Sequence, residues 1–330
     1  MSVFLFPVHS LNNNISNFLS KVKSAKIYES ITSGMQNEVN LIDKDCKLSD
    51  IAFIETLGDG TNNVTISSAF CQYFWLLCDI TLKILDRRII QGACVDFHIS
   101  ILDFKYSVEQ TLSIPRSKLS QMFPVNYQID VNRYLDYLHI VPELLDDDFW
   151  DKIGFEMALA DSLSQPDVKL DLDAFKAIDM KSKYSERTNS VYTYGMAFIM
   201  LHEMAHHQLN HLQKKEETED EVQADYKAFL EIYNDIQGEE RFSAICGMMS
   251  VFFVFMMLNP KLKVLGVHPR EEKRLMTIYD EVVKENPKYT LLLVSLLDFW
   301  AKICHVDDFP KDLSPAEESV RIIRQYFEAH

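Results

Sequence analysis

Residues 194–212 read YGMAFIMLHEMAHHQLNHL, and this stretch decides how the rest of the chain is interpreted. Residues 194–201 are almost wholly apolar, which together with their neighbours predicts a buried helix over Thr188–Leu212. His202 and His206 lie four residues apart in this helix. Because residues four apart share one face of a helix, the two imidazole rings can present their nitrogens to a single metal ion.

A carboxylate accompanies the two histidines, in the pattern His-Glu-x-x-His. Glu203 follows the first histidine, where it can lie near a metal ion without binding it and can take a proton from a water that the metal activates. The apolar residues before it predict the rigid support that a metal site needs. The pattern also arises by chance, so two histidines at the edge of a core, beside an exposed Glu203, are the alternative.

A second helix is predicted directly after this stretch. Residues 213–220 (QKKEETED) are polar and charged, which indicates an exposed connection. Thr218 and Glu221 have the spacing of a capping box, which predicts that the next helix opens there and runs to about Asn234. With so short a connection we expect the two helices to be antiparallel neighbours, so that Glu221 can face the histidines.

Acidic residues of this second helix complete the predicted site. A catalytic zinc ion takes three protein ligands and keeps one position open for water, and Glu221 completes such a set with His202 and His206. Asp225, one turn further along the same face, can accept the second ring N–H of either histidine and fix its orientation. The alternative is an ordinary amphipathic helix whose acidic first turn suits the helix dipole.

Three other histidines and one arginine are further candidates for the predicted site or its surroundings. His268 precedes a proline and a helical stretch, and it can hydrogen-bond a developing oxyanion, unless it is a plain surface histidine. Arg274 can pair with an acidic residue of the two helices above. His207 and His211 form another pair, about 100° around the first helix from the metal-facing pair. We interpret them as polar cover for the last helical turn; a second metal is the alternative.

The composition describes a globular, acidic protein. The chain has 330 residues, a formal net charge of -16 and 47% hydrophobic residues, which excludes the disordered and collagen-like classes. The acidic balance argues against binding to nucleic acid or an anionic membrane, because both need clustered Lys and Arg. The N-terminal MSVFLFPVHS lacks the basic start of a secretory signal, and the six cysteines form no Cys-x-x-Cys pair. We therefore expect a cytoplasmic protein with free thiols rather than disulfides.

Hydrophobic periodicity predicts the remaining elements. Ile51–Leu57 is expected to be a short strand, Ser67–Asp86 a helix, and Val95–Ile101, in which apolar and polar residues alternate, a half-buried strand. The longest apolar run, Ala244–Leu258, is shorter than the roughly 20 residues that cross a membrane. It is interpreted as a buried core helix, with a membrane span as the alternative.

The predicted fold class is α+β and zincin-like. Residues 1–185 are predicted to form a mixed α/β lobe that contains a small, mainly antiparallel sheet. This sheet packs on a predominantly helical, zinc-binding lobe in residues 186–330. The boundary follows the change in composition near residue 185, and the two parts form either separate lobes or one continuous domain. Val95–Ile101 is the candidate strand of this sheet.

The motif resembles that of the gluzincin zinc peptidases, which pair His-Glu-x-x-His with a later Glu-x-x-Ala-Asp, here Glu221 to Asp225. The resemblance implies that His202, His206 and Glu221 bind Zn²⁺ and that Glu203 is the general base. The His-Pro…Arg element at His268 is similar to that of the prenyl-protein and heat-shock-type membrane peptidases, which implies that His268 stabilises the transition state. The similarity covers residues 194–274, and this chain lacks the spans of those membrane enzymes.

An acidic, cytoplasmic chain with this pattern is more similar to the Lit-type phage exclusion peptidases, a family that kills infected bacteria by cutting translation elongation factor Tu. Soluble regulatory peptidases that cleave phage-type repressors are a close rival. The sequence thus predicts a zinc-dependent endopeptidase acting on a cytoplasmic protein or peptide, in phage defence or regulated toxicity. The alternatives are a zinc-bearing regulatory or binding protein with little hydrolytic activity, and a helical structural protein with a chance motif. Substrate and oligomeric state are left open.

Overall fold

The structure is a computed structural model. It describes residues 8–19, 40–42, 52–56, 62–115, 118, 138–164, 183–209, 211, 218–259, 261–262, 269–283, 286, 288–311, 313 and 317–329.

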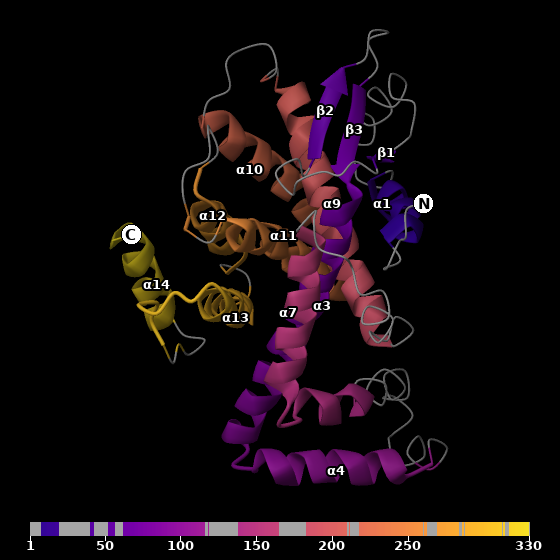
Figure 1. Cartoon of the computed structure of the whole chain (residues 1–330), viewed down its shortest axis with the longest axis vertical. Helices are drawn as coiled ribbons and strands as arrows, with labels where there is room; N and C mark the ends of the chain where they lie inside the picture. The colour runs from indigo at the N-terminus through magenta and orange to yellow at the C-terminus, as the bar shows by residue number, and fades with distance from the viewer. Residues whose placement is uncertain are drawn as a thin grey trace.

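Ten helices make up most of this described part of the chain (Figure 1). They are α1 (Val8–Leu19), α3 (Ser68–Asp96), α4 (Ile101–Ser113), α7 (Phe149–Ser164), α9 (Lys183–Gln208), α10 (Thr218–Asp235), α11 (Glu239–Leu258), α12 (Glu271–Val283), α13 (Lys288–Ile303) and α14 (Glu317–Ala329). The predicted helices over Ser67–Asp86, Thr218–Asn234 and Ala244–Leu258 are confirmed as parts of α3, α10 and α11. The predicted helix over Thr188–Leu212 is confirmed as α9, although it ends earlier, at Gln208.

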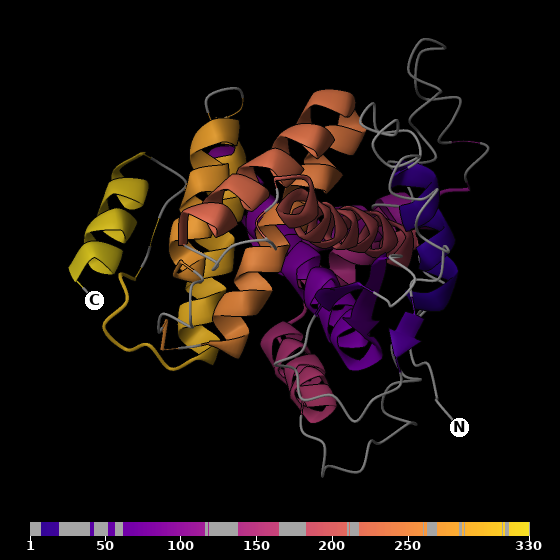
Figure 2. The ribbon, with the colours of Figure 1, turned by 90° about the horizontal axis from the view of Figure 1, so that it is seen from above.

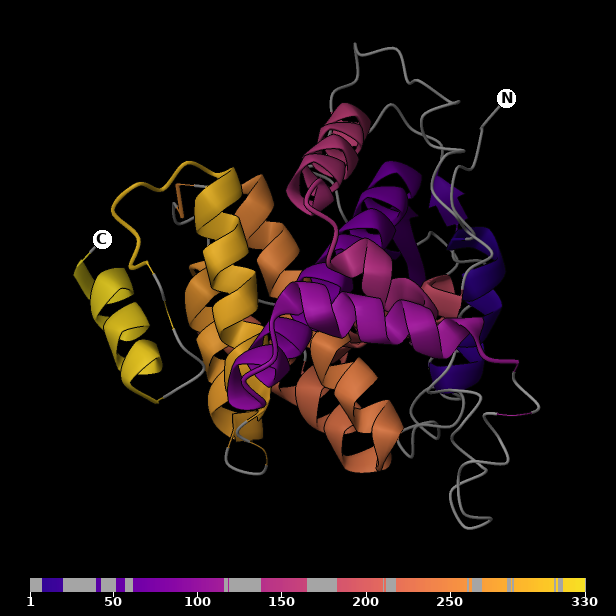
Figure 3. The same cartoon turned by 90° about the horizontal axis from the view of Figure 1, so that it is seen from below.

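Helix α9 is the centre of the arrangement. It packs against α10 and α11 and also contacts α1 and α3. Helices α1 and α14 lie on opposite sides of the molecule (Figures 1 and 2). Helix α4 lies across the end of α3 (Figures 1 and 3), and Figure 1 shows that this end of the molecule is opposite α10. The residues of the predicted metal site therefore lie on or beside the central helix, and their side chains are buried.

Three short strands form one small sheet. They are β1 (Asn40–Ile42), β2 (Ala52–Thr56) and β3 (Asn62–Ser67), in the order β1-β3-β2. β2 pairs with β3 antiparallel, with Ile54 opposite Val64, whereas β1 pairs with β3 in parallel. The strand predicted at Ile51–Leu57 is confirmed as β2.

The predicted α+β, zincin-like fold class is wrong. The described residues are predominantly helical, and the sheet is a minor part of them with one parallel and one antiparallel pair. The strand predicted at Val95–Ile101 is also wrong, because α3 continues to Asp96 and α4 begins at Ile101.

The alternation in Val95–Ile101 comes from a helix–helix turn. His98 has a positive φ of 54°, and the side chain of Ser100 caps α4 by accepting a hydrogen bond from the backbone N–H of Asp103. Val95 and Phe97 are 72% and 75% exposed. The apolar residues of this stretch thus point to the surface rather than into the core that a half-buried strand requires.

One buried core joins residues from both sides of the predicted boundary at residue 185. Trp75 of α3, Phe198 of α9 and Trp300 of α13 all belong to it. The stretch Glu240–Leu258 of α11 is long and apolar enough to cross a membrane, with a mean hydropathy of 1.8. However, 72% of this stretch is buried inside the protein. The cysteines that the structure describes are free. The division into lobes stays a prediction.

Two glycines let α9 and α11 approach closely. A Cβ atom on Gly247 would lie 2.4 Å from the carbonyl oxygen of Val191 and 2.7 Å from the backbone nitrogen of Gly195. The same contact region brings Phe198 of α9 against Phe252 of α11 in an edge-to-face pair, with ring centroids 5.4 Å apart. The close approach fixes the helix that carries both candidate metal-binding histidines.

Gly247→Ala is expected to lower the free energy of unfolding by about 1–3 kcal/mol, because the added methyl group meets backbone atoms that cannot move independently. Chemical denaturation followed by circular dichroism measures this change. Gly154→Ala is the matched control, since Gly154 lies in helix α7 with nothing within 4 Å of its added Cβ. The control should gain about 0.5–1 kcal/mol. Equal effects of the two changes would contradict the close packing of α9 on α11.

Candidate metal centre

Two neighbouring helices bring together three side chains of the types that can bind a metal ion. His202 and His206 lie on one face of α9, and Glu221 lies in the first turn of α10, which packs against α9. All three residues are buried. Among the residues that the structure describes, they form a group whose ligand atoms all lie within 4.8 Å of one another, so the group could hold a metal ion.

The separations between the donor atoms suit a small tetrahedral ion. His202 Nε2 lies 3.1 Å from His206 Nε2 and 3.5 Å from Glu221 Oε2, and His206 Nε2 lies 3.2 Å from Glu221 Oε1. Ligands at about 2.0–2.1 Å from a tetrahedral zinc ion are separated by roughly 3.3–3.4 Å. Two imidazole nitrogens and a carboxylate oxygen are also a donor set that zinc accepts.

A buried ion pair supports this group from behind. Asp225 Oδ1 lies 2.9 Å from His202 Nδ1, the ring nitrogen on the side away from the donor set. Arg274 of α12 donates two hydrogen bonds to the same carboxylate, of 2.6 and 2.7 Å, and its guanidinium also lies 3.7 Å from Glu221. The guanidinium stacks over the ring of Phe252 at 5.0 Å. Asp225 therefore links α12 to the first histidine.

These contacts shift the pKa values of the ion pair and of His202. Burial lowers the pKa of His202, but its contacts with Asp225 and Glu221 outweigh burial and raise that pKa to about 9. Burial raises the pKa of Asp225, yet the charge of Arg274 and the hydrogen bonds hold it below its usual value. A metal ion bound at His202 has to displace a proton from this ring, because the ligand is a neutral imidazole.

The second histidine has a support of its own, which the sequence analysis missed. His211 Nδ1 lies 3.1 Å from His206 Nδ1, and His211 Nε2 lies 3.3 Å from Asp220 Oδ1. His211 was expected to cover the last turn of a longer helix. Because α9 ends at Gln208, the chain turns and places His211 beside the ring of His206 instead. The signal in the sequence is Asn210, a residue type that favours helix ends.

Of the two predicted catalytic residues, the structure describes Glu203 but not His268. Glu203 lies on α9 next to His202 and is half-buried, whereas His202 and His206 are buried. It is thus nearer to solvent than the donor set. His268 lies outside the described residues, as do the side chain of His207 and residues 213–217 of the predicted connection. Residues 218–220 of that connection belong to α10 instead.

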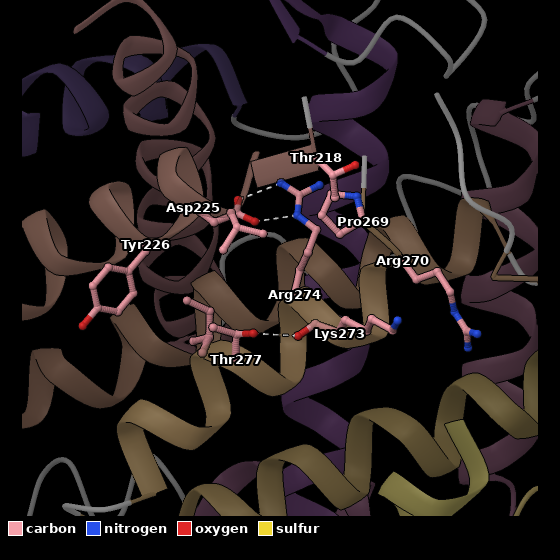
Figure 4. Close-up of a pocket in the computed structure, with 10 residues that line it drawn as sticks. Thr218, Asp225, Tyr226, Pro269, Arg270, Lys273, Arg274 and Thr277 are labelled. Atoms are coloured by element: carbon pink, nitrogen blue, oxygen red, sulfur yellow. Dashed lines mark hydrogen bonds and ion pairs between the residues drawn. The ribbon is translucent and has the colours of Figure 1, made fainter. Parts of the chain in front are cut away.

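A cavity of about 410 Å³ opens between α10 and α12 and reaches the ion pair behind the metal centre (Figure 4). Its walls include Val222, Asp225, Tyr226, Pro269, Lys273 and Arg274. Val222 and Tyr226 are partly exposed apolar side chains, while Asp225 and Arg274 form the buried end. A molecule that enters this cavity therefore comes into contact with the carboxylate that lies against His202.

Comparison with known proteins adds a family relationship. The model of the family described as Peptidase U49 matches residues 115–292, a little over half of the chain. The matched segment contains the three residues of the candidate metal-binding group and the residues that contact them, among them Asp220, Asp225 and Arg274. No curated protein and no solved structure matches the chain.

Proposed function

The chain belongs to the peptidase U49 family, and from this we propose that it is a zinc-dependent endopeptidase that cleaves a cytoplasmic protein. The observation that carries the proposal is the buried group of His202, His206 and Glu221, whose donor atoms are 3.1 to 3.5 Å apart. A peptidase family and a zinc-compatible donor set point to the same chemistry. The finer resemblance to gluzincins and to the Lit-type phage exclusion peptidases supports a role in phage defence or regulated toxicity.

The donor set has three ligands, so a tetrahedral metal ion bound there would keep its fourth position open for water. Zinc, when bound, supplies a Lewis acid that acidifies a water and polarises a carbonyl. In the proposed reaction, Glu203 takes the proton of the attacking water and passes it to the leaving amine. Asp225, held by Arg274, keeps His202 in the orientation that the donor set needs. His268 is proposed to stabilise the oxyanion, on the strength of the His-Pro…Arg resemblance.

The substrate is proposed to be a protein rather than a nucleic acid. A net charge of -16 repels phosphate backbones, which supports this choice.

Quantitative proteomics of new N-termini tests the proposal directly. Bacterial cells that express the wild-type chain are compared with cells that express Glu203→Gln at the same level. We expect a small number of new N-termini with the wild type and none of them with Glu203→Gln. The comparison is made during phage infection and with wild-type protein that carries zinc. If the wild type and Glu203→Gln then give identical sets of N-termini, the peptidase proposal is overturned and a zinc-bearing binding protein is left.

Glu221 and Asp225 are expected to affect metal binding unequally. Glu221→Ala removes a proposed ligand, whereas Asp225→Ala removes a group that contacts a ligand, a change that typically costs about 10–100-fold in metal affinity. Glu221→Ala should therefore weaken zinc binding more. Titration against a chelator of known affinity ranks the two variants. A larger loss with Asp225→Ala would mean that the ligand set is assigned wrongly.

A further inference from the structure

A second imidazole–carboxylate pair lies behind the metal centre, on the side of His206. It consists of His211, just beyond the end of α9, and Asp220, in the first turn of α10. Both are 2% exposed, so they are as deeply enclosed as the metal-binding group itself. Polar side chains buried to this degree nearly always have hydrogen-bond partners, so the contacts of these two residues indicate how they are held.

A metal ion at His206 Nε2 would, together with the geometry, set the proton positions in this pair. His206 turns its Nε2 toward Glu221 and His202, so a metal there needs the lone pair of Nε2, and the ring proton sits on Nδ1. His206 Nδ1–H then donates to His211 Nδ1, 3.1 Å away. His211 in turn carries its proton on Nε2, which faces Asp220 Oδ1 at 3.3 Å. Each ring thus fixes the tautomer of the next.

The two histidines of the donor set are supported in parallel ways. Asp225, held by Arg274, lies against His202 Nδ1, and His211, held by Asp220, lies against His206 Nδ1. The first support comes from α10 and α12, while the second comes from α10 and the segment that follows α9. Asp220 and Asp225 flank Glu221 in α10, so one helix supplies a proposed ligand and part of both supports.

We infer that His211 and Asp220 are positioning residues that lock His206 in its metal-binding tautomer and orientation. The inference rests on the proposed function. It gives a role to His211, which lies outside the His-Glu-x-x-His pattern. Each of the two metal-binding imidazoles, His202 and His206, then has its own supporting residue. Outer partners of this kind typically contribute about 10–100-fold to metal affinity or activity.

The tautomers can be measured in the unaltered protein. Long-range ¹H–¹⁵N correlation spectra of the zinc-loaded, ¹⁵N-histidine-labelled chain should show the Nδ1–H tautomer for His206 and the Nε2–H tautomer for His211. His211→Gln assigns the His211 signals. An Nδ1–H tautomer for His211 would overturn the inference, because that nitrogen could not then accept from His206.

Two substitutions test the effect on the metal. His211→Leu cannot accept a hydrogen bond and should weaken zinc binding by about 10–100-fold, whereas the amide oxygen of His211→Gln can accept it and should restore most of the affinity. The visible spectrum of the Co²⁺-substituted protein should change in the leucine variant and return toward that of the wild type in the glutamine variant. His139→Leu, at an exposed histidine, is the control and should change neither.

The outcomes separate this inference from the proposed function. If the wild type holds no zinc, both fail. If the wild type holds zinc, and His211→Leu matches it in affinity and cobalt spectrum, only the role of His211 fails. If His211→Leu does not fold, the tautomers of the unaltered chain decide the question.

Discussion

Glu203→Gln is expected to lower the rate of substrate cleavage by about 10²–10⁴-fold, the contribution that a general base typically makes. The substrate for this assay is the protein whose new N-terminus appears in cells. Glutamine has nearly the shape of glutamate but cannot accept the proton of the attacking water. Glu203 is half-buried beside His202 and is not part of the buried donor set, so the variant should fold and keep its zinc.

Matched measurements make this expectation decisive. Zinc content and the thermal unfolding midpoint of Glu203→Gln are compared with those of the wild type, and cleavage is compared at equal zinc occupancy. Unchanged cleavage by the zinc-loaded variant would refute the role of Glu203. A loss of cleavage that is accompanied by a loss of zinc would instead place Glu203 among the metal ligands.

Arg274→Met is expected to have the largest effect on stability. Arg274 is buried, makes two hydrogen bonds to Asp225, and lies 3.7 Å from Glu221. Its removal leaves two buried carboxylates without their guanidinium partner, and breaking a buried ion pair in this way costs about 3–5 kcal/mol. Denaturant unfolding in the presence of a chelator measures the loss without a contribution from metal binding.

An exposed ion pair of the same type provides the control. Arg321 pairs with Glu318 on α14, and their side chains are 58% and 62% exposed. Arg321→Met should leave the unfolding free energy almost unchanged, because water screens exposed pairs. A loss for Arg274→Met that is no larger than the loss for Arg321→Met would contradict the structural role of the buried pair.

The arrangement of the candidate site could be predicted from the sequence because helical spacing determines it. His202 and His206 are one turn apart, and the short connection to α10 brings Glu221 and Asp225 against them. The pairing of Arg274 with an acidic residue was likewise expected and is observed with Asp225. His211 could not be placed, because its position depends on where α9 ends rather than on a helical repeat.

The fold class could not be predicted, because a period of two in a short segment does not require a strand. In Val95–Ile101, the apolar side chains belong to the end of one helix, a turn and the start of the next, and Phe97 is exposed to solvent. Helical periodicity was more informative where it extended over many residues, as in α3, α10 and α11. Long helical patterns were therefore better predicted than short segments, in either half of the chain.

Elemental analysis of the native protein, prepared without chelator, tests the central claim most directly. If His202, His206 and Glu221 hold a catalytic zinc ion, the wild type should contain about one zinc ion per chain, as expected for a site with three protein ligands. His202→Ala and His206→Ala should contain close to none. A native protein without zinc, or histidine variants that keep the zinc content of the wild type, would contradict the claim.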